Sequence, residues 1–232
     1  LENMLREPCG CFEQSSSSNY PNVLILDYLK TTNQAAPQIE QRARGLMASG
    51  YQKLTSFECI PPEARDQRRG YEWFGQTAPP HEALTAYGLL QFRDMSKVYP
   101  VDQEMIKRTQ KFLLDQRDGT GGFKRNARAL DSFGRAPQHL TNAYIVWALT
   151  ETGAGADLAK ELDALLIQAQ DDQRAAKDPY FLSLVSLGCL NAGKTEAGLE
   201  LLKKVRAVQQ KDGRITGAAT SITTSGGQAL DV

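Results

Sequence analysis

The sequence has 232 residues, of which 41% are hydrophobic, and its 27 basic and 27 acidic side chains give a formal net charge of zero. This length is enough for one domain with a sizeable core, and the balanced charge, without a basic stripe or an arginine-rich arm, argues against a nucleic-acid partner. The longest apolar runs, such as residues 23–26, are too short to cross a bilayer, so no membrane span is predicted.

The first informative stretch is residues 8–14, in which Cys11 and Gln14 place a thiol and a primary carboxamide three positions apart. If the backbone folds back so that the Cys11 sulfur reaches the side-chain carbonyl of Gln14, loss of ammonia gives an internal thioester. The thiolate leaves easily because a thiol has a pKa near ~8.5. Gly10 supplies the backbone freedom that a tight loop requires. The sequence therefore predicts a stored acyl group formed by the chain itself, with no separate cofactor.

Beyond this motif, apolar residues recur at spacings of three and four, and strand-type alternation is nowhere sustained. Gly and Pro cluster between the periodic segments. The pattern predicts an all-α chain with about eight helices, which lie near residues 23–29, 39–54, 83–95, 105–114, 140–149, 158–169, 179–190 and 195–208.

A weak internal repeat suggests how these helices are arranged. Residues 116–119 (Gln-Arg-Asp-Gly) recur as residues 210–213 (Gln-Lys-Asp-Gly), and each copy follows a predicted helix and opens a Gly-rich turn. Repeated helix pairs stack on one another. The closed form of such a stack is an α/α toroid, which is the predicted fold.

Several motifs together resemble the thioester region of the α2-macroglobulin and complement family. They are the Cys11–Gln14 core with its flanking Pro8 and Gly10, followed in order by residues 19–23, 50–54, 84–87 and 121–123. The resemblance covers most of the chain and implies the same α/α toroid. Many members of the family have glycine after the reactive cysteine. This chain has Phe12 there, a bulkier form that resembles bacterial members more than vertebrate complement.

The resemblance implies a function in which the thioester reacts once. After proteolysis elsewhere in the parent protein, the family's thioester couples covalently to the attacking protease or to amines of a target surface, so the domain is a protease inhibitor and not an enzyme that turns over. It also implies neighbouring domains and an extracellular or bacterial periplasmic or envelope location. Residues 1–232 are expected to be a single thioester domain cut from a larger protein. Because relatives continue into further helices where residues 215–232 are rich in Gly, Ser and Thr, the toroid is expected to be incomplete at its C-terminus.

The resemblance also assigns control of the thioester to particular positions. Some members hold an acyl-accepting histidine after the Gly-Phe turn, and the matching residue here is Asp131. Without an imidazole nucleophile at that position, amines are expected to attack Gln14 directly. Asp131 has the alternative role of a helix cap. Phe74 is expected to shield the thioester from water, and the helix that carries Tyr87 is expected to pack close to it.

Two further residues have both a functional and a structural interpretation. His81 begins the helix that carries Tyr87, and it is either a helix-start residue or a functional neighbour of the thioester. Glu13 is either a first-turn carboxylate favoured by the helix dipole or an acid in the reaction.

The four cysteines do not have the spacing of a metal site, and no metal is predicted. Cys9 and Cys11 are so close in sequence that a disulfide between them would be strained. Cys189 lies in an apolar segment and is expected to be buried. The sequence does not decide whether Cys59 is free or paired.

Three other functions stay open at this stage. A cysteine hydrolase would use Cys11 with His81. A glycosidase would need paired carboxylates, for which Asp171 and Asp172 at a polar helix end are poor candidates. A non-covalent binding module would keep the toroid with a lapsed thioester. A thioester requires both Cys11 and Gln14, a hydrolase requires only Cys11, and a glycosidase requires neither.

Overall fold

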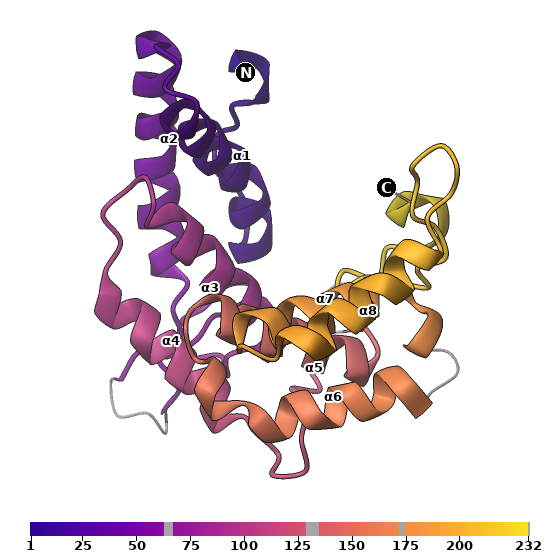
Figure 1. Ribbon diagram of the computed structural model, residues 1–232. Coiled ribbons are helices and arrows are strands. Elements are labelled where there is room, and N and C mark those ends of the chain that lie inside the picture. Colours follow the sequence, from indigo (N-terminus) through magenta and orange to yellow (C-terminus); the bar gives the residue numbers. More distant parts are fainter. Residues whose placement is uncertain (63–66, 129–134, 172–174, 232) are drawn as a thin grey trace. The chain divides into compact units, whose positions relative to one another are not determined.

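The computed structural model describes residues 1–62, 67–128, 135–171 and 175–231 (Figure 1). Within these residues the regular structure consists of eight α-helices and short 3-10 segments, and strand-like pairing is limited to isolated bridges. The prediction of an all-α chain is therefore confirmed for the described part. The chain divides into two compact units, Leu1–Phe112 and Leu113–Val232, and the division falls within α4 (Gln103–Asp115).

The first unit is built on three helices, α1 (Phe12–Thr31), α2 (Pro37–Ser56) and α3 (Glu82–Met95), preceded by the 3-10 turn η1 (Glu2–Met4). Helix α1 packs against both α2 and α3, and Figure 1 shows α1 and α2 side by side. The core between them is apolar and almost fully buried, and it includes Phe12, Ile25, Met47, Leu54, Leu84, Leu89 and Met95. The connection between α2 and α3 adds the buried Tyr71 and Trp73 to this core.

Helix α1 starts at Phe12, well before residue 23, where the predicted helix begins, and it continues through Pro21. The predicted helix therefore began too late, while the alternative in which Glu13 lies in the first turn of a helix agrees with the structure. The buried face of this first half is polar, so it has no apolar periodicity to detect. Asn22 accepts from the Arg6 backbone N–H at 3.1 Å and donates to the Arg6 carbonyl at 2.7 Å, while Gln91 of α3 donates to the Ser16 carbonyl at 3.3 Å.

The second unit contains the helices α5 (Gln138–Glu151), α6 (Ala159–Asp171), α7 (Pro179–Asn191) and α8 (Thr195–Ala207), with the 3-10 turns η4 (Gly155–Asp157), η5 (Ala175–Lys177) and η6 (Gly227–Leu230). Helix α7 packs against α5, α6 and α8, and α5 also packs against α6.

The internal repeat appears in this unit as two similar turns. After α4, an isolated bridge joins Arg117 to Phe123, and after α8 another joins Gln209 to Ile215. Gly119 and Gly213 have positive φ angles of 81° and 94°, which only glycine adopts without strain. The repeated sequence thus encodes a repeated way of ending a helix.

No helix in the described residues is long and apolar enough to cross a membrane.

A partly buried carboxylate connects α1 to the end of α3. Asp94 accepts a 2.7 Å hydrogen bond from the Tyr20 hydroxyl, and it lies 2.8 Å from the Lys97 ammonium and 3.0 Å from the Arg93 guanidinium. Burial by itself would raise the pKa of Asp94, but the hydrogen bonds from Lys97, Tyr20 and Arg93 outweigh it and hold that pKa below its usual value.

This shift predicts how Asp94→Asn changes stability. A carboxylate with a lowered native pKa stabilises the fold above about pH 4, and the stabilisation is lost as the pH falls through the native pKa. We expect Asp94→Asn to lower the free energy of unfolding by about 1–2 kcal/mol at neutral pH. The variant should also lose less of its stability than the parent chain as the pH falls below about 4, as measured by urea unfolding at a series of pH values. Asp212, whose pKa is also lowered but which is fully exposed, provides the control, because solvent screens its interactions and Asp212→Asn should change stability much less. An unchanged acid dependence in Asp94→Asn would contradict this role.

Candidate functional site

The start of α1 brings the thiol and the carboxamide of the sequence motif together. Cys11 is the N-cap residue, with φ −74° and ψ −177°, and it forms both halves of a capping box with Gln14. The backbone N–H of Cys11 donates to Gln14 Oε1 at 3.1 Å, and the Cys11 side chain faces the backbone N–H of Gln14. The Gln14 side chain thus satisfies the N–H of the N-cap residue, and the Cys11 side chain takes the facing position of the capping box. The two residues therefore meet in the first turn of a helix and not in an open loop.

Gly10 lies directly against the Gln14 carboxamide. An added Cβ at Gly10 would lie 2.0 Å from Gln14 Oε1 and 2.9 Å from Gln14 Cδ, and the φ of Gly10 is 79°. Gly10 is therefore needed for two reasons, its conformation and the space it leaves. The Ser15 hydroxyl lies within hydrogen-bonding distance of the carbonyls of Cys9, at 3.1 Å, and Gly10, at 3.3 Å, and so holds this turn to the helix. We refer to residues 9–14 as the Cys11 turn.

Phe12 fixes the Cys11 turn to the core of the first unit. Its side chain is fully buried and stacks on Tyr71 with ring centroids 4.7 Å apart, while Phe57 meets it edge-on at 6.1 Å. Its backbone N–H donates to the Trp73 carbonyl at 2.8 Å. Gly88 on α3 makes room for the ring, since a Cβ at that position would lie 2.6 Å from Phe12 Cζ.

Glu13 is connected to His81 through Trp73. The Trp73 indole donates to Glu13 Oε2 at 3.3 Å, and the buried indole meets the His81 ring edge-on at 4.9 Å. His81 is fully buried as the N-cap of α3, where its Nδ1 accepts from the Leu84 N–H at 3.4 Å. These contacts agree with a helix-start role for His81 and place it behind the tryptophan.

The two remaining candidates of this unit lie at different depths. Phe74 has 63% of its surface exposed, and its backbone N–H donates to Glu72 Oε2 at 2.7 Å. Tyr87 is half-buried with its hydroxyl 3.4 Å from Ser17 Oγ. Burial raises the pKa of Tyr87 and the nearby Glu13 carboxylate adds to this, whereas the Ser17 hydrogen bond opposes it. The Tyr87 hydroxyl thus lies beside Ser17 of α1, one turn after Gln14. The roles of Tyr87 and Phe74 near the thioester stay predictions.

Asp131, the position matched to the family's histidine, lies outside the described residues. Both of its suggested roles, in place of the acyl-accepting histidine or as a helix cap, are therefore still predictions.

The four cysteines fall into two classes by exposure. Cys9 is exposed and Cys11 is partly exposed, whereas Cys59 and Cys189 are fully buried. Burial, with smaller effects of the Glu72 and Glu58 carboxylates, raises the pKa of Cys59 to about 12. Burial also raises the pKa of Cys189, whose predicted burial is confirmed. Thiols open to reagents therefore occur at the start of α1. Across the described ranges, no group of three or more His, Cys, Asp or Glu residues could hold a metal ion.

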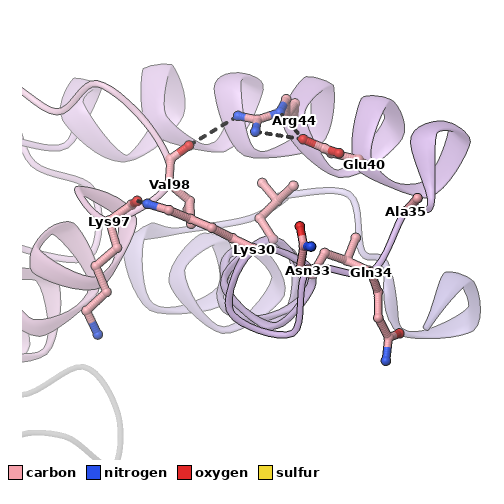
Figure 2. Close-up of a pocket in the computed structure, with 10 residues that line it drawn as sticks. Lys30, Asn33, Gln34, Ala35, Glu40, Arg44, Lys97 and Val98 are labelled. Atoms are coloured by element: carbon pink, nitrogen blue, oxygen red, sulfur yellow. Dashed lines mark hydrogen bonds and ion pairs between the residues drawn. The ribbon is translucent and has the colours of Figure 1, made fainter.

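A separate pocket of about 470 Å³ lies between the α1–α2 connection and the end of α3 (Figure 2). Its cationic side chains already have partners. Lys30 donates to the Lys97 carbonyl at 2.7 Å, and Arg44 donates to Glu40 at 2.8 Å and to the Val98 carbonyl at 3.2 Å. Its lining contains neither a thiol nor a histidine. This pocket therefore adds no thiol or imidazole to the site at the Cys11 turn.

Sequence reasoning missed three contributors to this site. Trp73 was given no role, but it hydrogen-bonds to both Phe12 and Glu13. Ser15 and Gly88 were not singled out. A glycine in the middle of an apolar helix is a signal of close packing, so Gly88 was the detectable one of these two.

Comparison with known proteins identifies relatives that cover most of the chain. Residues 1–217 match the family model described as the A-macroglobulin TED domain. Alpha-2-macroglobulin-like protein 1 of Mus musculus is 25% identical over 210 residues, which are 87% of this chain and 14% of that protein. Ovostatin of Gallus gallus is 25% identical over 218 residues, which are 92% of this chain and 14% of that protein. The chain thus spans about one seventh of the length of these relatives.

Among solved structures, Escherichia coli alpha-2-macroglobulin activated by porcine elastase matches with a TM-score of 0.64 and 18% identity, over 96% of this chain and 18% of that chain. At this level of identity the similarity shows the fold alone. The predicted fold class, an all-α chain of the α/α toroid type, is thereby confirmed.

Substitution of Gly10 should distinguish the effect of filling the space beside Gln14 from the effect of straining the backbone at a positive φ. In Gly10→Ala the methyl group would displace the Gln14 carboxamide, so we expect the fraction of chains that lose one ammonia, read from the intact mass, to fall severalfold. Gly119→Ala is the matched control, because Gly119 has a similar φ of 81° but open space around it. Both variants should lose about 1 kcal/mol of stability from backbone strain. An equal ammonia loss in Gly10→Ala and the parent chain would contradict this placement of Gln14.

The burial of Phe12 predicts a large effect of its truncation. We expect Phe12→Ala to lower the free energy of unfolding by about 3–5 kcal/mol, because it leaves a cavity beside Tyr71. Phe74→Ala, which removes an exposed ring two positions from Glu72, should change stability by less than about 0.5 kcal/mol. Urea unfolding of the two variants measures the difference, and similar midpoints would show that Phe12 is not the anchor of α1.

Proposed function

Because the chain belongs to the A-macroglobulin TED domain family, we propose that Cys11 and Gln14 form an internal thioester that captures an amine in a single acyl transfer. The observation that supports this most strongly is the reciprocal pairing of these two residues at the start of α1. We take residues 1–232 as one thioester domain, part of a larger protease inhibitor.

Formation of the thioester starts from the geometry of the capping box. The Cys11 sulfur attacks Gln14 Cδ, the C–N bond breaks, and the thiol proton leaves with the amide nitrogen as ammonia. Negative charge develops on Gln14 Oε1 during this step. That oxygen already accepts from the Cys11 backbone N–H at 3.1 Å, so the N–H stabilises the oxyanion as it forms.

Opening of the thioester uses the same atoms in the other direction. An amine nitrogen attacks Gln14 Cδ, the C–S bond breaks, and an amide forms while Cys11 returns as a free thiol. The thiolate is the better leaving group, so the tetrahedral intermediate collapses toward the amide. Asp131 has no imidazole to form an acyl intermediate, which favours direct attack by lysine side chains.

The surroundings of the Cys11 turn protect the bond from water on one side. Phe12, Tyr71 and Trp73 are buried directly behind it. The other side is open at Cys9 and half-open at Cys11. We propose that neighbouring domains of the parent protein cover this open side until proteolysis of that protein exposes the thioester to its target.

The partners and location follow from this function. The covalent partners are an attacking protease or amines of a target surface, and the protein acts outside the cell or in a bacterial periplasm or envelope. The chain provides its own acyl donor through Cys11 and Gln14, without a bound cofactor. The hydrolase alternative has weaker support, because His81 Nδ1 accepts from the Leu84 N–H and its ring lies against Trp73.

The intact mass of the purified chain, measured before and after methylamine, tests the proposal. We expect a starting mass lower than the sequence mass by one ammonia, and addition of one methylamine with release of one thiol. Cys11→Ser and Gln14→Ala should each restore the full sequence mass and abolish the addition. Cys9→Ser should retain both.

The outcomes separate the competing functions. A chain of full sequence mass that takes up no methylamine would contradict the thioester and favour the non-covalent module. Cys11-dependent hydrolysis that survives Gln14→Ala would favour the hydrolase.

A further inference from the structure

A second thiol lies beside the proposed thioester and has no role in it. Cys9 is exposed and is separated from Cys11 by Gly10 alone. Both sulfurs are free. When the thioester opens, Cys11 becomes a thiol again, so the Cys11 turn then holds two accessible thiols.

The backbone between the two cysteines is bent. Consecutive carbonyls of an extended chain point in opposite directions, yet the carbonyls of Cys9 and Gly10 both lie within hydrogen-bonding distance of the Ser15 hydroxyl, at 3.1 and 3.3 Å. Gly10 also has a φ of 79°. Fully extended, residues two apart are separated by at most about 7 Å, and a disulfide needs a Cα separation of about 4.4–6.8 Å. The bend at Gly10 shortens the separation toward this range.

We propose that Cys9 and Cys11 form a dithiol that small-molecule disulfides close into an internal disulfide, and that this disulfide prevents thioester formation by withholding the Cys11 thiol from Gln14. The second half of this inference rests on the proposed thioester. The first half depends only on the two cysteines and the turn between them.

The reaction is a pair of thiol–disulfide exchanges with glutathione disulfide as the oxidant. The Cys9 thiolate attacks one sulfur of the reagent, forms a mixed disulfide and releases the first glutathione thiolate. The Cys11 thiolate then attacks the Cys9 sulfur, forms the Cys9–Cys11 bond and releases the second glutathione. The protein loses two electrons and two protons, and the reagent is reduced to two thiols.

The other two cysteines do not compete for this chemistry. Cys59 and Cys189 are fully buried, and their raised pKa values keep them as thiols. A disulfide across a single residue is strained and therefore easily reduced. The switch is thus selective for the Cys11 turn and reversible by a dithiol reductant.

The test treats the methylamine-opened chain with glutathione disulfide and measures its mass under native conditions. We expect the loss of two hydrogens without a glutathione adduct, and trypsin should place the bond in the peptide from Glu7 to Lys30, which carries both cysteines. Cys9→Ser and Cys11→Ser should each keep one glutathione instead. A parent chain that keeps two glutathiones would overturn the inference.

A second measurement tests the effect on the thioester. The unfolded chain is refolded in glutathione buffers of increasing oxidising strength, and the fraction that loses ammonia should fall in proportion to the disulfide fraction. The Cys9→Ser chain should lose ammonia in every buffer in which its mass shows no glutathione on Cys11. Ammonia loss that is independent of the buffer would overturn the inference and leave the thioester intact. Absence of ammonia loss even in the reducing buffer would contradict the thioester itself, and the switch with it.

Discussion

The structure of the site depends on one reciprocal interaction, in which Cys11 and Gln14 cap the first turn of α1. A helix start leaves backbone N–H groups without intrahelical partners, and a side chain three residues away commonly returns to satisfy one of them. Here the two side chains that perform this structural task are also an electrophile and a nucleophile. The proximity that a ring closure needs is therefore provided by ordinary helix capping and requires no separate device.

A single segment from the α2–α3 connection holds the capped turn in place. It contacts the two residues between Cys11 and Gln14, since the Trp73 carbonyl accepts from Phe12 and the Trp73 indole donates to Glu13. These contacts hold the two residues that separate Cys11 from Gln14. Any rearrangement of this segment would reach the reacting atoms through two hydrogen bonds, so the turn is sensitive to changes that begin outside it.

The sequence predicted the fold better than the site's surroundings. The predicted helices that correspond to α2 to α8 are all present, and several of them begin or end beside Gly or Pro, as α3 does after Pro79 and Pro80. The first half of α1 was missed because its buried face carries Ser16, Asn19 and Asn22, whose burial depends on partners far away in sequence. Cys11 and Gln14 were found from their chemistry. The role of Trp73 was not, because one of its two contacts uses its backbone carbonyl, which no side-chain pattern reveals.

Phe12 and Gly88 have a consequence for sequence variation in related chains. The ring occupies the space that a side chain on α3 would need, since a Cβ at Gly88 would lie 2.6 Å from Phe12 Cζ. The two positions are thus coupled by volume: a chain with a small residue after its cysteine gains room at the α3 position, and a chain with a large one loses it. Residues at positions 12 and 88 should therefore vary together and not independently.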